Sequence, residues 1–240
     1  LTDFLTWRVS GDLARSICTV TCKWTYLGHE KRWDDSYFRA IGLGDLADQG
    51  FSRIGTNVVE AGTPLGAGLT EQAAADLGLP EGTAVGAGLI DAHAGGIGSV
   101  CDAPEDRLAY VFGTSSCTMT STTEPAFVPG VWGPYFSAMV PGLWLNEGGQ
   151  SAAGAAIDEL ILHHPLAPEA QRLAQDAGMS LPDWLAGHAE ECDVLQMVKG
   201  LHVVPEPIGN RAPHADPNTR AAISGIGMDR SEDSLVALYL

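Results

Sequence analysis

The hydrophobic pattern of the first hundred residues alternates between helical and extended stretches. Apolar positions over residues 1–29 recur at helical spacing, with a break near Ser10-Gly11. Residues 30–70 are polar and rich in turns, and Thr70 then stands where it can cap a short helix, Glu71 to Leu77. The apolar run 84–90 predicts a buried strand that ends at Asp91, where small residues predict a turn.

The second part of the chain is richer in strands. The pattern predicts strands at 108–112, 116–121, 134–140 and 142–146, the last one broken by the run 146–151. Further on it predicts a helix from Ala152 to about His163, one or two short helices in 165–195, strands at 201–205 and 220–226, and a final helix capped by Ser231. This order predicts an α/β or mixed α/β protein in two parts that meet near residue 100, with a ligand crevice between them.

Composition narrows the class of protein. The chain has 240 residues, 45% of them hydrophobic, which is enough for a normal core in one large or two smaller domains. The net charge of -17 argues against nucleic-acid binding, which needs a basic face. No apolar run approaches the roughly 20 residues of a membrane helix, and the first residues show no signal-peptide pattern, so we expect a cytoplasmic protein.

The five cysteines form no paired framework. Cys18 and Cys22 are close in sequence, at a helical spacing of four, but they supply too few ligands for zinc. We interpret the cysteines as reduced thiols of the kind that cytosolic proteins bury.

Two stretches carry candidate chemistry. The first is Asp91, a carboxylate delivered by an apolar run and followed by glycines that let the backbone pass close to a ligand. The second follows the apolar run 108–112: in the turn Gly113-Thr114-Ser115-Ser116, backbone N–H groups and hydroxyls can hold a phosphate. A carboxylate base together with a phosphate-holding turn suggests phosphoryl transfer to a hydroxyl.

Three other side chains are weaker candidates. Glu147 precedes two glycines that would let it approach a small polar ligand, and Lys23 stands among apolar and aromatic neighbours, although a lysine there can also extend to solvent. The pair Asp91 and His93 permits the alternative of a metal-dependent hydrolase. That alternative needs further ligands, and the remaining histidines show no recognisable ligand spacing.

Several short motifs, taken in order, resemble the FGGY carbohydrate kinases. Within that family the chain looks most like the D-ribulose kinase branch, with the L-ribulokinases next. The resemblance covers nearly the whole chain, and each motif is weak alone but strong in this order and spacing. The motifs are Thr6-Trp7-Arg8 with Thr21-Cys22-Lys23-Trp24, Leu89-Ile90-Asp91-Ala92-His93-Ala94-Gly95, Val111-Phe112-Gly113-Thr114-Ser115, Glu147-Gly148-Gly149-Gln150-Ser151, and Gly209-Asn210-Arg211-Ala212-Pro213 through Asp216-Pro217 to Gly225.

The resemblance implies an α/β fold of two actin-like (ribonuclease H-like) domains flanking a cleft, each incomplete in this chain. Residues 1–100 would be the C-terminal part of the sugar-binding domain, and residues 101–240 the first part of the nucleotide-binding domain. The implied activity is the ATP-dependent phosphorylation of a ketopentose, D-ribulose or a similar pentulose, at a terminal hydroxyl.

The resemblance also implies roles for single residues. Asp91 would be the general base, Lys23 and Glu147 would bind the sugar together with Asp91, and the phosphates of ATP would meet Gly113, Thr114 and Ser115. The implied cofactors are ATP and Mg²⁺. The resemblance allows Asp91 to lie next to the ion but assigns no residue as a metal ligand. The partner is a small sugar, and a homodimer is left open.

Two family features have no counterpart in the chain. They are the Asp-Gly-Thr phosphate loop with which the family opens and the glycine loop that binds adenosine. We therefore expect a fragment that has little or no kinase activity alone. The alternatives left open are another FGGY kinase acting on L-ribulose, xylulose or a polyol, a non-catalytic sugar-binding relative, and the metal-dependent hydrolase.

Overall fold

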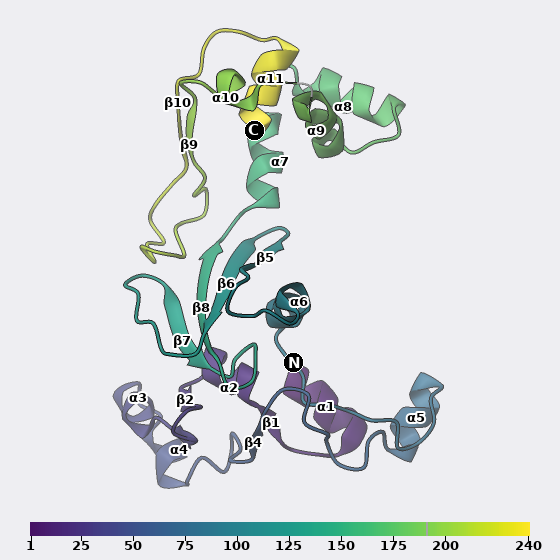
Figure 1. Ribbon diagram of the computed structural model, residues 1–240, viewed down its shortest axis with the longest axis vertical. Helices are drawn as coiled ribbons and strands as arrows, with labels where there is room; N and C mark the ends of the chain where they lie inside the picture. The colour runs from purple at the N-terminus through teal and green to yellow at the C-terminus, as the bar shows by residue number, and fades with distance from the viewer. Residues whose placement is uncertain (191) are drawn as a thin grey trace. The chain divides into compact units, whose positions relative to one another are not determined.

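The chain divides into two units (Figure 1). A computed structural model describes residues 1–190 and 192–240. Unit 1 contains residues 1–111 and 118–148, and unit 2 contains residues 112–117 and 149–240. The chain therefore passes from one unit to the other at more than one point.

The first part of unit 1 is built from short elements around an aromatic cluster. Strands β1 and β4 pair in parallel, and β2 pairs antiparallel with β3. The ring of Trp33 lies against the rings of Tyr26, Phe38 and Phe51, and its indole N–H donates to the carbonyl of Gly55 over 3.0 Å. The elements are α1 (Thr2–Ser10), β1 (Arg15–Ser16), α2 (Ile17–Lys23), β2 (Tyr26–Leu27), β3 (Arg32–Trp33), α3 (Asp35–Ala40), α4 (Gly44–Asp48), β4 (Val58–Val59) and α5 (Glu71–Leu77).

The rest of unit 1 contains a helix and most of a four-stranded sheet. Helix α6 (Asp91–Val100) precedes β5 (Ala109–Phe112), β6 (Ser116–Thr122), β7 (Trp132–Phe136) and β8 (Trp144–Gln150), and the strand order is β5-β6-β8-β7. Helix α6 approaches the neighbouring side chains closely through Gly96, because a Cβ there would lie 2.5 Å from the sulfur of Met139 and 2.9 Å from a carbon of Met119. The small residues after Asp91 thus serve helix packing.

Unit 2 is mainly helical. Helices α7 (Gly154–Leu162), α8 (Ala167–Asp176), α9 (Leu181–Glu190), α10 (Val194–Met197) and α11 (Glu232–Tyr239) accompany the antiparallel pair β9 (His202–Val204) and β10 (Ala222–Ser224). Their core consists of Ile161, Leu181, Leu185, Leu235, Val236 and four alanines. The alanines lie on α8 and α9, where small side chains let the helices pack closely.

Local sequence signals were reliable where a cap or a turn residue defines an end. Helix α5 spans Glu71–Leu77 as predicted, with the Thr70 hydroxyl accepting from the Ala73 N–H and with Gly78 left-handed at its C-terminus. The cap at Ser231 is also confirmed, because its hydroxyl accepts from the Ser234 N–H. Helices α3 and α4, in the stretch expected to be turns, were missed.

Three predictions next to the candidate residues are wrong. Residues 84–90 are extended but form no strand, and Asp91 begins helix α6 where a turn was predicted. The segment pairs with the loop 62–65, where the Leu65 N–H donates to the carbonyl of Val85 and the Ala87 N–H to that of Thr63. The Thr63 N–H donates to Glu60 instead, so the pairing stops at a single bridge between Pro64 and Gly86. Strand β8 also continues through the glycines to Gln150, so Glu147 lies on a strand and not in a loop.

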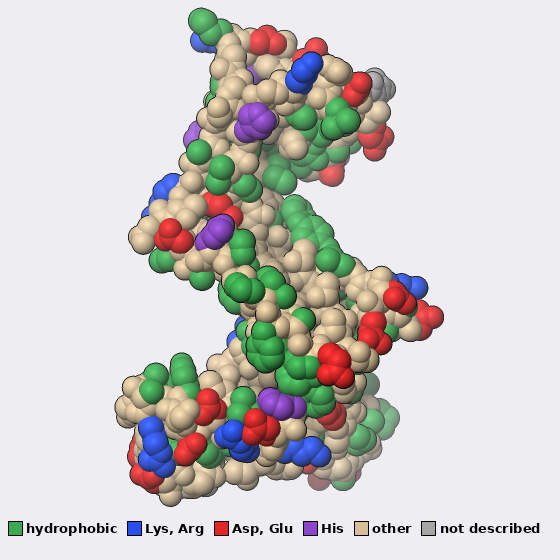
Figure 2. Space-filling model, turned by 60° about the vertical axis from the view of Figure 1, so that its left-hand side comes forward, with side chains coloured by type: hydrophobic (Ala, Val, Ile, Leu, Met, Phe, Trp, Pro, Cys, Tyr) green, Lys and Arg blue, Asp and Glu red, His purple; other side chains and the backbone are tan. Residues whose placement is uncertain are grey.

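Charged and apolar side chains are mixed at the surface. Figure 2 shows acidic side chains spread over the visible face, with hydrophobic side chains between them. In the described part of the chain, no helix combines the length and the apolar character needed to cross a membrane.

Two glycines with positive φ test the packing of unit 1. A Cβ at Gly68 (φ 89°) would lie 2.5 Å from the carbonyl oxygens of Gly82 and Thr83, whereas a Cβ at Gly78 (φ 67°) would meet no atom within 4 Å. We expect Gly78→Ala to lower the free energy of unfolding by ~1 kcal/mol through backbone strain alone. Gly68→Ala should lower it by ~3 kcal/mol, since overpacking adds to strain. Urea unfolding measures both, and equal losses would contradict the backbone contact at Gly68.

Candidate active site

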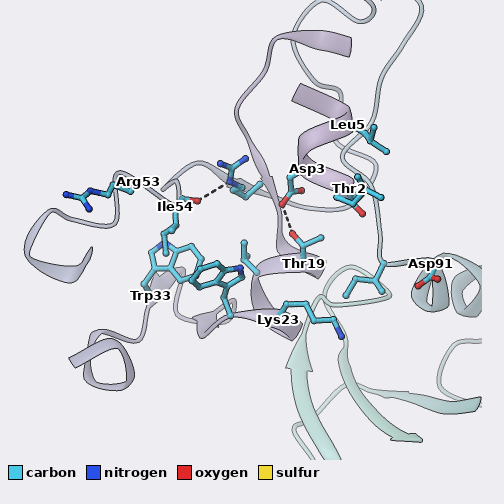
Figure 3. A pocket seen from close by; sticks show the side chains of 14 residues that line it. Thr2, Asp3, Leu5, Thr19, Lys23, Trp33, Arg53, Ile54 and Asp91 are labelled. Carbon is cyan, nitrogen blue, oxygen red and sulfur yellow. Dashed lines mark hydrogen bonds between the residues drawn. The ribbon is translucent and has the colours of Figure 1, made fainter. Parts of the chain in front are cut away.

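A cavity of about 660 Å³ in unit 1 brings two of the predicted residues together. Lys23 from α2 and Asp91 from α6 both line it, and Figure 3 shows them reaching the cavity from these separate elements. The remaining lining residues come mainly from α1, α2 and the segment 53–54; they are Leu1, Thr2, Asp3, Leu5, Arg15, Thr19, Val20, Trp24, Trp33, Arg53, Ile54 and Ile90.

Asp91 is the first residue of α6. Its side chain is exposed, and its Oδ1 accepts a hydrogen bond from the N–H of Ala92 over 2.9 Å. The residue before it, Ile90, has the extended backbone of an N-cap, so the chain enters the helix directly at the carboxylate. An acidic residue is favourable at this end of a helix. The helix start therefore holds Asp91 at the cavity wall, a role that the sequence analysis gave to a turn.

Lys23 is the last residue of α2, and its side chain is exposed. No carboxylate of the described residues forms an ion pair with it. Other polar groups of the cavity are already engaged. Asp3 accepts from Thr19 over 2.7 Å, as a dashed line in Figure 3 shows, and Arg15 donates to the carbonyl of Ile54 over 3.0 Å. The ammonium group of Lys23 is therefore available to a ligand. No motif of the sequence pointed to Asp3, Arg15 or Thr19.

Glu147 lies on β8 opposite Trp132 of β7. It is not among the residues that line the cavity, and its side chain is only 13% exposed. Its Oε2 lies 3.5 Å from the Nε2 of His93. Lys23 and Glu147 act in opposite directions on the pKa of Cys22, which Glu147 raises and Lys23 lowers, so both lie around the same thiol.

His93 lies in the core of unit 1. It was weighed as a metal ligand beside Asp91, but residues two apart on a helix face different ways, and His93 is buried with 2% of its surface exposed. Its Nδ1 lies 3.2 Å from the Sγ of Cys18 and 3.1 Å from the carbonyl oxygen of Ala138. Cys18 is therefore part of a polar network. Helical periodicity of residues 91–100 was the signal that could have separated His93 from Asp91.

The neighbours of His93 favour its charged form. Burial lowers its pKa, but the hydrogen bonds with Cys18 and Glu147 outweigh burial and raise the pKa to about 9. The pKa of the Cys18 thiol is lowered to about 5, first by the hydrogen bond from Cys22, against the effect of burial, and further by His93 and the N–H of Ile90. The hydrogen bond with Cys18 and burial raise the pKa of Cys22. Burial, Cys22 and Glu147 raise the pKa of Tyr135.

The residues predicted to hold phosphate lie in unit 2. Gly113, Thr114 and Ser115 form an exposed bend between β5 and β6, and the N–H of Gly113 donates to the carbonyl of Ser115 over 2.9 Å. The start of α7 holds this bend, because Ala153 donates to the carbonyl of Thr114 and Gly154 to that of Gly113. The hydroxyl groups of Thr114 and Ser115 thus face solvent from a backbone that these hydrogen bonds hold in place.

The metal-hydrolase alternative finds no ligand cluster. Among the described residues, no group of three or more His, Cys, Asp or Glu side chains is arranged to hold a metal ion. Both ring nitrogens of His93 are within hydrogen-bonding distance of protein atoms, so that residue would have to leave its network to bind one.

Comparison with known proteins identifies the family. Residues 108–240, more than half of the chain, match the model of the FGGY family of carbohydrate kinases, C-terminal domain. The chain belongs to the FGGY family of carbohydrate kinases, as the resemblance implied.

Relatives of known sequence align with the whole chain. It is 46% identical to an FGGY carbohydrate kinase domain-containing protein of Danio rerio, with 100% of this chain and 47% of that protein covered. It is 36% identical to a D-ribulokinase of Saccharomyces cerevisiae, with 100% and 39% covered. The chain thus spans about half or less of the length of the curated relatives it matches.

Solved structures confirm the fold class. The gluconate kinase of Lactobacillus acidophilus matches with a TM-score of 0.68 at 15% identity, over 99% of this chain and 44% of that one. The xylulose kinase of Rhodospirillum rubrum matches with a TM-score of 0.61 at 21% identity, over 99% and 43%. At such identities the likeness concerns the fold alone, which is the actin-like α/β fold predicted from the resemblance.

The network around His93 makes a testable prediction about its ionisation. We expect His93 to titrate near pH 9, because Cys18 and Glu147 stabilise the imidazolium. Since this pKa exceeds the ordinary 6.5, the contribution of His93 to folding stability is complete below about pH 6.5 and is lost as the pH rises through about 9. Glu147→Gln should lower the pKa.

An NMR titration of the His93 ring protons measures the pKa in both proteins. The control is Glu30→Gln, which alters an exposed glutamate beside His29 and Arg32 and should leave His93 unchanged. A His93 pKa at or below 6.5, or one that Glu147→Gln does not move, would show that the contact is not an ion pair.

Proposed function

We propose that the whole protein is an ATP-dependent kinase that phosphorylates a ketopentose, D-ribulose or a similar pentulose, at a terminal hydroxyl. The observation that carries the proposal is the cavity of unit 1, which is lined by the exposed carboxylate of Asp91 and by Lys23, whose ammonium forms no ion pair with the described residues. Membership of the FGGY family supports a sugar kinase, and the 36% identity to a D-ribulokinase supports a pentulose as substrate.

Asp91 is the proposed general base. Its Oδ1 is oriented by the Ala92 N–H, which leaves Oδ2 to accept the proton of a sugar hydroxyl. As that proton moves to Asp91, the sugar oxygen forms a bond to the γ-phosphorus of ATP, and the bond from that phosphorus to the β-phosphate oxygen breaks. Asp91 thus orients the hydroxyl and removes the charge that would develop on it.

Lys23 and Glu147 are the proposed sugar-binding residues beside Asp91. An ammonium group donates hydrogen bonds to the carbonyl or hydroxyl oxygens of a ketose, and a carboxylate accepts them from its hydroxyls. Glu147 is held by His93 through Oε2, so its Oε1 is the oxygen proposed to meet the sugar.

Gly113, Thr114 and Ser115 are the proposed phosphate-binding residues. Their exposed bend offers the hydroxyls and backbone N–H groups of Thr114 and Ser115, donor types that phosphate oxygens accept from, whereas the Gly113 N–H already donates to the carbonyl of Ser115. Mg²⁺, when bound, would neutralise phosphate charge, and it is commonly held by the phosphates with one or two protein carboxylates. We assign residues 1–100 to the sugar-binding domain and 101–240 to the nucleotide-binding domain.

Asp91→Asn tests the base in the whole protein. With ATP, Mg²⁺ and D-ribulose, we expect kcat to fall by ~10²–10⁴-fold, because proton transfer to a positioned side chain contributes about that much. The dissociation constant of the sugar, measured by calorimetry, should change little. Asp35→Asn is the matched control, because Asp35 is an exposed first residue of a helix, as Asp91 is, but lies outside the cavity.

Two results would contradict this assignment. Undiminished turnover in Asp91→Asn would remove Asp91 from the chemistry. A wild-type protein that binds the sugar but phosphorylates none of a panel of D-ribulose, L-ribulose, xylulose and polyols would be the non-catalytic relative.

Thr114→Ala tests the phosphate bend independently. Loss of a hydrogen bond to a charged phosphate should raise the KM for ATP by about 10- to 100-fold and leave sugar binding unchanged. Thr120→Ala, at an exposed threonine of β6, is the control. Steady-state kinetics with varied ATP decide the matter, and an unchanged KM for ATP would remove Thr114 from the phosphate site.

A further inference from the structure

We propose that His93 is a positioning residue of the sugar site, which orients Glu147 through Nε2 and fixes the start of α6 through Nδ1 and Cys18. The inference rests on the proposed function, because it takes Glu147 and Asp91 as sugar-binding residues. It concerns a residue that touches neither the sugar nor ATP and acts through the groups that do.

The contact between His93 and Glu147 meets an energetic need of the carboxylate. Glu147 is 87% removed from solvent on its side chain, and a carboxylate in such a place requires a cation or several donors. The Nε2 of His93, 3.5 Å from Oε2, supplies the cation. A carboxylate anchored through one oxygen has few orientations left, so the second oxygen is presented in a defined direction.

The opposite side of the imidazole connects to the segment that carries Asp91. Nδ1 faces the carbonyl of Ala138 at 3.1 Å and the Sγ of Cys18 at 3.2 Å. The same Sγ accepts the N–H of Ile90 over 3.4 Å, and Ile90 is the N-cap residue immediately before Asp91. A chain of buried polar contacts thus runs from Glu147 through His93 and Cys18 to the backbone at the base.

This chain joins the three elements that carry the proposed sugar-binding residues. Cys18 and Lys23 lie on α2, His93 and Asp91 on α6, and Glu147 on β8. A buried polar network is seldom needed for stability, because apolar groups of the same shape are often as good. This network connects the elements that carry Asp91, Lys23 and Glu147, and both Lys23 and Glu147 lie around Cys22. These connections favour a role for the network in arranging the three residues.

The charged imidazole suits this role. An imidazolium has an N–H on each ring nitrogen, so it can donate to Ala138 and to Glu147 at once, whereas a neutral ring can donate on one side only. The pKa of about 9 keeps both donors in place at neutral pH.

Two substitutions separate the two sides of the ring. In His93→Asn the amide nitrogen can replace Nδ1 but cannot reach Glu147, whereas in His93→Gln it can replace Nε2. In the whole protein with D-ribulose, we expect His93→Asn to raise the sugar KM by about 10- to 100-fold, the effect of one hydrogen bond to a charged group, and His93→Gln to restore most of it. The KM for ATP should stay within about threefold, because the phosphate bend is untouched.

A double-mutant cycle distinguishes positioning from general packing. If His93 acts through Glu147, His93→Asn should raise the sugar KM of Glu147→Gln by much less than it raises that of the wild type. Val100→Ala is the control for packing, since Val100 is fully buried on the same helix. It should lower Tm without changing the sugar KM.

The outcomes separate this inference from the proposed function. A wild-type protein that neither binds nor phosphorylates a pentulose overturns the proposed function, and the positioning role with it. An active wild type in which His93→Asn leaves the sugar KM unchanged, or in which the effects of His93→Asn and Glu147→Gln multiply independently, overturns the inference alone. If His93→Asn does not fold, the comparison is made with His93→Gln in the wild-type and Glu147→Gln backgrounds. A sugar KM of His93→Gln as high as that of Glu147→Gln then overturns the inference about His93.

Discussion

The burial of one imidazole constrains the rest of unit 1. His93 has 2% of its surface exposed, yet both of its ring nitrogens meet polar partners, on α2, on β8 and in the turn after β7. A buried charge of this kind is tolerated only when its partners are fixed around it. The elements that meet at His93 therefore have to keep fixed distances from one another. The positions of the side chains that line the neighbouring cavity are fixed with them.

Close packing supplies the rigidity that the network needs. Helix α6 can approach Met119 and Met139 because its residues there are small. This approach places His93 next to Glu147 on the neighbouring strand. In the same helix, Asp91 faces the cavity and His93 faces the core. Two residues of one short motif thus perform opposite tasks, one toward the ligand and one toward the protein.

The sequence could predict what depends on nearby residues. Thr70, Gly78 and Ser231 set helix ends by local hydrogen bonds or backbone conformation, and those ends were predicted correctly. The order of the family's motifs also led to the family and its fold, and helical spacing correctly placed Cys18 and Cys22 on one short helix. The strand expected at 84–90 failed because strand formation depends on a distant partner, the loop with Pro64. The contacts of His93 join residues 45 to 75 positions apart, which no local pattern reveals.

The bend at Gly113–Ser115 is attached to the first residues of α7, and the far end of that helix places Ile161 in the core shared with α8, α9 and α11. The bend is therefore connected to the helical core of unit 2 through a single helix. A substitution that displaces the first residues of α7 would displace the backbone that presents the hydroxyls of Thr114 and Ser115 as well.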